Sequence, residues 1–249
     1  MRKHFVILSI ITSFFLYSCN DNNPRPLLIA TAANMQFAIP SLLKKFTETT
    51  GIKCEPIISS SGKLTAQIKE GAPYSVFLSA DMKYPEVLYR EGLTITSPKI
   101  YAYGTLVLWS IAESNSLSLD LLNSPSISHI ALANPKTAPY GKAAMEVLQH
   151  LNVSSTLKEK LIFGESIAQT NQFITSQAAD FGFTAKSVVV SPIVKGQGQW
   201  ITIDTSLYSP IEQGIVLLKN TPDKLKEAQL FYDFLLSEKG QAILKKHGY

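Results

Sequence analysis

The sequence has few of the residues that mark several specialised classes of protein. Among its 249 residues there are two cysteines, Cys19 and Cys54, which cannot supply a disulfide framework or a zinc ribbon. We expect Cys54 to be a buried free thiol. The four histidines are far apart, so no metal site or other cofactor is expected. No apolar run reaches the roughly 18 residues of a spanning helix, which excludes a multispan membrane protein.

The sequence also lacks a large excess of charge of one sign. Charged residues make up 17% of the sequence and hydrophobic residues 45%, which is typical of a globular protein. The formal net charge is +4, and Arg2 and Lys3 contribute to it. There is no run of lysines and arginines, so no nucleic-acid partner is expected. The length suits one large domain or two lobes of about 100–130 residues each.

The N-terminus has the features of an export signal. Basic residues at positions 2–4 precede an apolar stretch, positions 5–17, that is too short to span a membrane. Residues 1–18 are therefore predicted to be a signal peptide. The run Leu16-Tyr17-Ser18-Cys19 resembles the lipobox of bacterial lipoproteins, which implies acylation at its cysteine and a tether over residues 19–26. Ordinary signal cleavage nearby is the alternative.

From Leu27 onward, short apolar runs alternate with amphipathic stretches, which predicts an α/β protein with largely parallel sheets. Pro40 does not fit mid-helix, so the helix after Asn34 is expected to start late or to kink. We expect strands at Leu27–Ala32, Lys53–Ser59, Ser75–Leu78, Tyr103–Trp109, His129–Ala133, Phe181–Thr184, Trp200–Ile203 and Gly214–Leu218. We expect helices at Leu42–Thr49, Lys63–Lys69, Pro85–Arg90, Gly141–Leu151, Ala168–Ser176, Lys224–Leu236 and Glu238–Lys246.

Four strand-to-helix junctions carry small, hydroxyl or amide residues where a helix is about to begin. They are Thr31-Ala32-Ala33-Asn34, Ser59-Ser60-Ser61-Gly62-Lys63, Ala138-Pro139-Tyr140-Gly141-Lys142 and Glu165-Ser166-Ile167-Ala168. A helix N-terminus has unpaired backbone N–H groups and about half a positive charge, and small residues let an anion approach them. Ordinary capping explains each junction singly. Four such ends directed at one point would balance a dianion without lysine or arginine.

Competing motifs are incomplete. The run Ser61-Gly62-Lys63-Leu64 lacks the Ser/Thr and the earlier glycine of a phosphate-binding loop. There is no Gly-x-Ser-x-Gly sequence, and Ser61 has no evident histidine partner for hydrolysis. We expect the Lys63 side chain to be solvated and Asp81 to cap the helix that follows it.

Several segments resemble the periplasmic molybdate-binding proteins of ABC transporters. They are Ile29-Ala30-Thr31-Ala32-Ala33-Asn34-Met35, Ser59-Ser60-Ser61-Gly62-Lys63-Leu64, positions 71–81 (the most specific), positions 133–141, and the C-terminal positions 231–235 and 240–244. The resemblance covers Leu27 to Tyr249. It implies the two-lobed α/β fold of type II periplasmic binding proteins, each lobe a mostly parallel sheet flanked by helices, with the ligand between the lobes. The first lobe would comprise residues 27–103 and 211–249, and the second residues 104–210.

The resemblance also implies contacts to a bound oxyanion. They are Asn34, Ser61, Tyr140 and Ile167, with Ala33 as a secondary contact. Ser61 is expected to donate its hydroxyl and its backbone N–H, Asn34 its amide, and Ile167 only its backbone N–H. Tyr140 replaces an alanine common in the family, and either its phenol or only its N–H would donate. Ala185 stands where other members have a hydrogen-bonding tyrosine.

A pocket of N–H and O–H donors suits fully ionised molybdate or tungstate, whereas hydrogen phosphate needs an acceptor for its proton. Glu165 is an acceptor close by in sequence, although we expect it to cap a helix. We therefore expect a monomeric, non-enzymatic solute-binding protein outside the cytoplasm, lipid-anchored at Cys19, that closes around the anion and delivers it to an ABC permease. Three alternatives stay open: the same fold binding sulfate or another oxyanion, a secreted hydrolase or transferase using Ser61, and an anchored sensor or adhesion protein without ligand binding.

Overall fold

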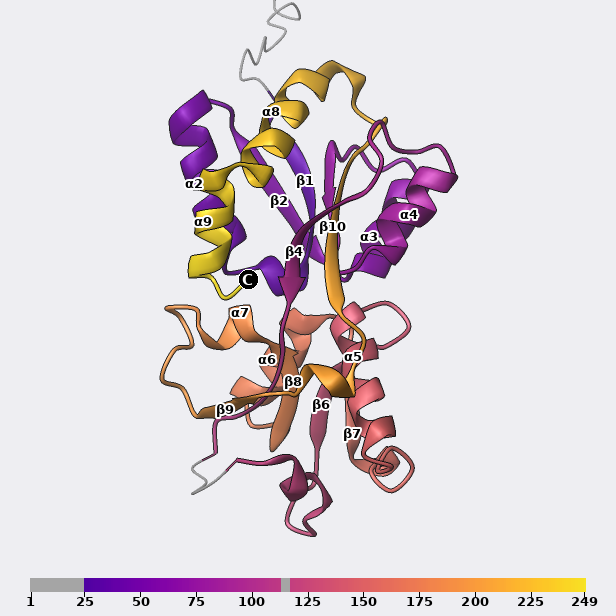
Figure 1. Ribbon diagram of the computed structural model, residues 1–249, viewed down its shortest axis with the longest axis vertical. Helices are drawn as coiled ribbons and strands as arrows, with labels where there is room; N and C mark the ends of the chain where they lie inside the picture. The colour runs from indigo at the N-terminus through magenta and orange to yellow at the C-terminus, as the bar shows by residue number, and fades with distance from the viewer. Residues whose placement is uncertain (1–24, 113–116) are drawn as a thin grey trace, which may run out of the picture.

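The computed structural model describes residues 25–112 and 117–249, which form two α/β lobes stacked end to end (Figure 1). The predicted signal peptide, the acylation site Cys19 and most of the predicted tether lie outside the described residues. None of the described helices is both long enough and apolar enough to cross a membrane.

The first lobe is built on a five-stranded sheet with the strand order β2-β1-β3-β10-β4. Strand β1 runs parallel to β2 and β3, whereas β10 runs antiparallel to β3 and β4. The bounds of these strands are β1 Leu27–Ala32, β2 Cys54–Ser59, β3 Val76–Leu78, β4 Lys99–Gly104 and β10 Ile211–Leu217.

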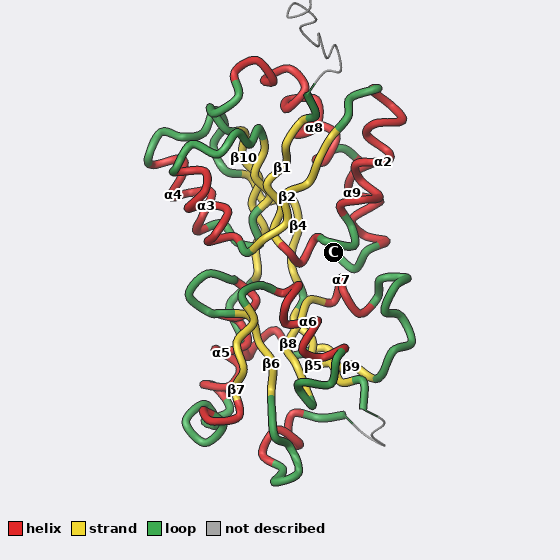
Figure 2. The backbone as a smooth tube through the Cα atoms, turned by 180° about the vertical axis from the view of Figure 1, so that it is seen from behind, coloured by secondary structure: helices red, strands yellow, loops and turns green. Residues whose placement is uncertain are grey.

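Helices cover both faces of this sheet (Figures 1 and 2). Because side chains alternate along a strand, Ile29 faces one helical layer while its neighbour Ala30 faces the other. One layer contains α2 (Ile39–Thr50), α8 (Leu225–Leu236) and α9 (Glu238–Lys246), preceded by the short turns η2 (Ala33–Met35) and η6 (Pro222–Lys224). The other layer contains α3 (Ser61–Lys69) and α4 (Lys83–Arg90).

The second lobe repeats this plan with a sheet in the order β7-β6-β8-β5-β9. Here β6 is parallel to β7 and β8, and β5 is antiparallel to β8 and β9. The strands are β5 Leu106–Ser110, β6 Ile130–Ala133, β7 Leu161–Gly164, β8 Phe181–Ala185 and β9 Gln199–Thr202. The helices are α5 Pro139–His150, α6 Ile167–Thr175 and α7 Lys186–Val189, with short turns η3 Leu119–Asn123, η4 Lys158–Lys160 and η5 Thr205–Leu207.

The chain passes between the lobes twice. Only Thr105 separates β4 of the first sheet from β5 of the second, and residues 203–210 lead from β9 back to β10. We call β4 and β10 the crossover strands. The two sheets use the same parts of the chain as the two predicted lobes, and the exact lobe boundaries stay a prediction. The C-terminus lies at the level where the lobes meet (Figures 1 and 2).

The predicted two-lobed α/β fold is confirmed, with one refinement of the sheets. Each sheet is mixed, because a single strand, β10 or β5, runs against the other four. The expected strand Tyr103–Trp109 is two strands, β4 and β5. The sequence reasoning missed β7, a four-residue strand at the edge of its sheet, and α7, which has a single turn. Pro40 lies in the first turn of α2, where its missing N–H costs nothing.

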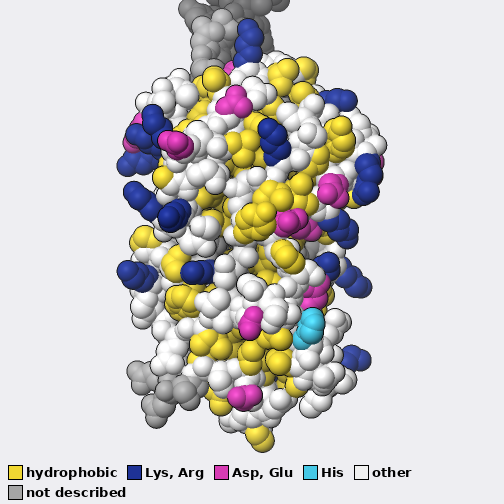
Figure 3. All heavy atoms as spheres, in the orientation of Figure 1, with side chains coloured by type: hydrophobic (Ala, Val, Ile, Leu, Met, Phe, Trp, Pro, Cys, Tyr) yellow, Lys and Arg dark blue, Asp and Glu magenta, His cyan; other side chains and the backbone are white. Residues whose placement is uncertain are grey.

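The surface and the remaining cysteine are unexceptional. On the face drawn in Figure 3, basic and acidic side chains are interspersed rather than gathered by sign. Cys54 at the start of β2 is a free, half-buried thiol, and burial raises its pKa to about 12. It therefore stays protonated, as a structural thiol does.

Candidate functional site

A small cavity lies between the lobes, where four strand-to-helix junctions meet. Its volume is about 10 Å³, room for about one water-sized sphere. No charged side chain is among the residues that line it, which are Ala32, Ala33, Asn34, Ser60, Ser61, Ala80, Ala138, Pro139, Tyr140 and Ile167. The four predicted contacts and the secondary contact Ala33 therefore come together at one place.

Each of the four junctions starts a helix or a helical turn, as the sequence predicts. The starts are η2 at Ala33, α3 at Ser61, α5 at Pro139 and α6 at Ile167. None of the residues preceding them caps its helix through a side chain. The first N–H groups of a helix have no partner within it, and they carry the positive end of its dipole. The cavity is thus bordered by uncapped helix starts from both lobes.

The serine loop before α3 supplies two hydroxyls to the cavity wall. Ser61 Oγ accepts a hydrogen bond from the Ala80 backbone N–H at 3.0 Å, so its own proton is left to donate. Ser60 is 3% exposed, and its Oγ has no partner among the described residues. The sequence reasoning did not select Ser60. Its position before the helix would have suggested capping, which it does not perform.

Asn34 is 1% exposed and lies in η2, where its side chain is held from behind the cavity. Its Nδ2 donates to Gln213 Oε1 at 2.9 Å and to Tyr249 Oη at 3.0 Å. Its Oδ1 is buried and has no partner in the described part of the chain. The Asn34 backbone carbonyl accepts from Ser187 Oγ and Tyr249 Oη, both at 2.9 Å.

The Tyr140 phenol points toward β10 and the end of β4. Its Oη accepts a hydrogen bond from Gln213 Nε2 at 3.3 Å. A Cβ on Gly104 would lie 2.4 Å from Tyr140 Oη, so the phenol occupies the space that a side chain at position 104 would need. Complete burial raises the pKa of Tyr140 well above its ordinary value of 10, which keeps the phenol neutral. Ala185 is buried at the end of β8 and is not among the residues that line the cavity.

The remaining predicted contact, Ile167, is 3% exposed at the first position of α6. Its hydrocarbon side chain leaves the backbone N–H as its only donor. Glu165, the acceptor near it in sequence, is exposed and does not line the cavity. Its carboxylate forms an ion pair with Lys63 of the first lobe, so the expected helix cap at Glu165 is not observed. The Lys63 side chain is exposed, as predicted.

Direct contacts join the two lobes around the cavity. The Gly62 backbone N–H donates to the Thr137 carbonyl at 2.9 Å, and Tyr84 Oη donates to the Lys136 carbonyl at 3.1 Å.

Asp81 performs the expected capping role, since its Oδ1 accepts from the Tyr84 backbone N–H at 3.3 Å. Burial raises the pKa of the Asp81 carboxyl, while that hydrogen bond lowers it.

No histidine, cysteine or carboxylate is among the described residues that line the cavity. Within the described ranges, no group of three or more His, Cys, Asp or Glu side chains is placed to hold a metal ion. The cavity is lined by neutral residues at helix starts, an arrangement that suits anion binding.

The sequence model of one protein family, the bacterial extracellular solute-binding proteins, matches residues 27–249, which is nearly the whole described chain. The chain belongs to this family. Extracellular solute-binding proteins similar to it include the molybdate-binding protein ModA of Rhodobacter capsulatus, 38% identical over 89% of this chain and 87% of that protein. ModA of Azotobacter vinelandii is 37% identical, over 89% of this chain and 88% of that protein.

Solved structures support the same placement among the extracellular solute-binding proteins. The Azotobacter vinelandii periplasmic molybdate-binding protein superposes on this chain with a TM-score of 0.85 and 35% sequence identity. The superposition covers 90% of this chain and 98% of that one. The two-lobed architecture with two mixed sheets is therefore that of this family.

Proposed function

We propose that this protein binds molybdate or tungstate between its lobes and delivers it to an ABC permease. The observation that carries the proposal is the convergence of four uncapped helix starts, two from each lobe, on one cavity without a charged side chain. Such starts stabilise an anion through N–H groups and helix dipoles. The names of the similar molybdate-binding proteins indicate which anion to test first.

The proposed contacts are Asn34, Ser61, Tyr140 and Ile167, with Ala33 as a secondary contact. Ser61 would donate its hydroxyl and Ile167 its backbone N–H. Ser60, with an unpartnered buried hydroxyl on the same wall, is added to them. A bare dianion can satisfy all these donors at once. Hydrogen phosphate brings a proton of its own, and no carboxylate lines the cavity to accept it.

Loading requires the lobes to separate. The cavity has room for little more than one water-sized sphere, and a tetrahedral oxyanion is larger. We infer that the lobes open by bending at the crossover strands, admit the anion and close around it. The interlobe contacts of Gly62 and Tyr84 would form on closure. Delivery to a permease, a periplasmic or cell-surface location and anchoring through Cys19 complete the proposal.

A ligand panel tests the proposed function. Thermal melts of the purified protein with sodium molybdate, tungstate, sulfate, phosphate or chromate should show the largest stabilisation by molybdate or tungstate, because a ligand stabilises only the state that binds it. Calorimetric titration should then give one site per chain. The variant Ser61→Ala serves as the control and should lose most of the shift. A larger shift with sulfate would assign the same fold to another oxyanion, and no shift with any of the five anions would overturn the proposal.

A further inference from the structure

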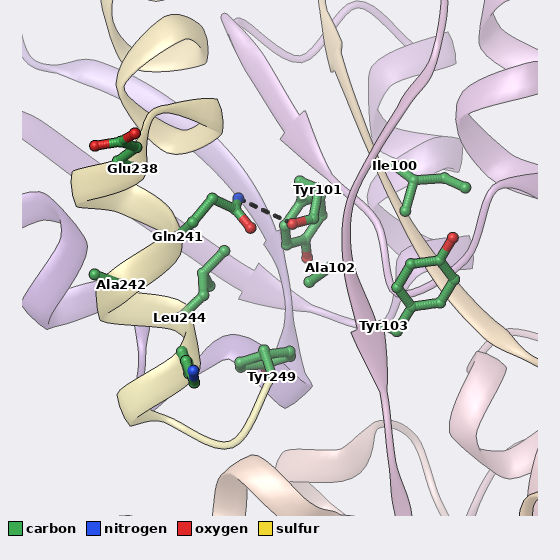
Figure 4. A pocket seen from close by; sticks show the side chains of 10 residues that line it. Ile100, Tyr101, Ala102, Tyr103, Glu238, Gln241, Ala242, Leu244 and Tyr249 are labelled. Atoms are coloured by element: carbon green, nitrogen blue, oxygen red, sulfur yellow. Dashed lines mark hydrogen bonds between the residues drawn. The ribbon is translucent and has the colours of Figure 1, made fainter.

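A buried hydrogen-bond network behind the cavity joins the proposed ligand contacts of both lobes to the crossover strands. Its centre is Gln213 on β10, which is fully buried. Gln213 Oε1 accepts from Asn34 Nδ2 at 2.9 Å and from Tyr101 Oη at 2.8 Å, and Gln213 Nε2 donates to Tyr140 Oη at 3.3 Å. The hydroxyls of Tyr101 and Tyr249 contact Gln213 and Asn34 respectively. Figure 4 shows these two tyrosines, Tyr101 on β4 and Tyr249 after α9.

In this arrangement the Asn34 amide has the wrong polarity for an anion. Both hydrogens of Nδ2 are donated away from the cavity, to Gln213 and Tyr249, neither of which lines it. The end that is left is Oδ1, which is buried without a partner. A carbonyl oxygen can only accept hydrogen bonds. Facing an oxyanion it would repel the ligand instead of holding it.

Reversing the two amides corrects the polarity without moving the heavy-atom framework, because the O and N ends of an amide side chain have nearly the same shape. In the reversed arrangement Gln213 Nε2 donates to Asn34 Oδ1 and to Tyr101 Oη. Gln213 Oε1 accepts from Tyr140 Oη. Asn34 Nδ2 then takes the position of the unpartnered oxygen and can donate to an anion.

The surrounding hydroxyls can follow this reversal, since each has a second partner within reach. Tyr101 Oη lies 3.4 Å from the Ser79 carbonyl and can donate to it. Tyr249 Oη can donate to Asn34 Oδ1 in place of the Asn34 carbonyl. That carbonyl keeps its hydrogen bond from Ser187 Oγ at 2.9 Å. In the reversed arrangement each of these donors has an acceptor, provided that an anion is present for Asn34 Nδ2.

We propose that Gln213 is a positioning residue for oxyanion binding, which holds Asn34 with Nδ2 toward the anion by presenting its own Nε2 to Asn34 Oδ1. This inference rests on the proposed function. It also assigns Tyr140 a role, because in the bound arrangement its hydroxyl donates to Gln213 and its contribution to the anion is the backbone N–H. Gln213 contacts no ligand atom and acts through Asn34.

A double-mutant cycle tests this coupling, with Gln213→Leu, Asn34→Ala and the double variant titrated with sodium molybdate by calorimetry. In the wild-type background, Gln213→Leu should raise the Kd for molybdate by about 10- to 100-fold. This is the effect expected when the hydrogen bond from Asn34 to the charged anion is lost. In the Asn34→Ala background the same change should raise Kd by less than about threefold. Equal fold-changes in the two backgrounds would overturn the inference. Gln149→Leu, an exposed change on α5, is the matched control and should bind like wild type.

A second measurement uses the unaltered protein, in case a variant does not fold. The side-chain amide resonances of Asn34 and Gln213 in ¹⁵N-labelled wild type should both move when sodium molybdate is added. The inference fails if the Gln213 resonance stays in place while the backbone resonances of the four junctions move. If the wild type shows neither heat nor resonance changes with molybdate, the proposed function fails and this inference falls with it.

Discussion

Gly62→Ala is expected to separate the stability of the protein from its ligand affinity. Gly62 lies in the first turn of α3, and its N–H donates to the Thr137 carbonyl of the other lobe at 2.9 Å. A Cβ at position 62 would lie 3.0 Å from both Cα and Cβ of Thr137, and 2.8 Å from Tyr84 Oη. The Tyr84 hydroxyl is the tip of a flexible side chain and can shift. The Thr137 backbone is part of the opposite lobe and cannot shift in this way. The added methyl group therefore obstructs closure of the two lobes.

The substitution should raise the stability of the ligand-free protein and lower its affinity for molybdate. When the lobes are apart, alanine stabilises a helix relative to glycine by about 0.5–1 kcal/mol, so the ligand-free variant should melt a few degrees higher. Overpacking typically costs about 1–3 kcal/mol. If that cost falls on the closed state, the Kd for molybdate rises about 5- to 150-fold. Calorimetry gives the Kd, and small-angle scattering with and without molybdate reports the loss of compaction.

The exposed substitution Lys44→Ala on α2 is the control, since it changes helix propensity without touching the other lobe. It should leave the Kd unchanged. A wild-type Kd for Gly62→Ala, or ligand-induced compaction equal to that of wild type, would refute the argument that the lobes close onto Gly62.

Three further substitutions and one labelling experiment test the site and its surroundings. Asn34→Asp should raise the Kd for molybdate at least about tenfold in calorimetry, because a carboxylate cannot donate and repels a dianion. Ile167→Val should stay within about twofold of wild type, since the proposed contact is its backbone N–H; a large loss would contradict that contact. Gly104→Ala should lower the melting temperature by several degrees, because its Cβ would meet Tyr140 Oη; an unchanged melt would refute the packing described. Cys54, with a pKa of about 12 instead of the ordinary 9.0, should be alkylated at pH 8 about a thousandfold more slowly in the native state than after unfolding, as measured by mass spectrometry.

The sequence predicted the local parts of this molecule well, because their causes are local. Strand β1 and helix α9 have the bounds that their apolar patterns indicate, Leu27–Ala32 and Glu238–Lys246. The four helix starts follow from small and hydroxyl residues just after apolar strands. Strand β7 escaped detection because it is short, lies at a sheet edge and has partly exposed side chains, so its hydrophobic pattern is weak.

The partners of the candidate site were beyond reach from the sequence. Gln213 and Tyr249 hold Asn34 from 179 and 215 positions away, and no spacing rule connects residues so far apart. The ion pair of Lys63 with Glu165 likewise depends on how the lobes meet.

By itself, then, the sequence determined where helices begin and that the candidate site would be made of neutral donors, because both depend on residue type over a few positions. Only the tertiary structure decided that the four starts meet at one cavity and which residues hold the Asn34 amide beside it. The orientation of a buried amide is set by the donors and acceptors that the fold brings around it, and these come from both crossover strands and both lobes.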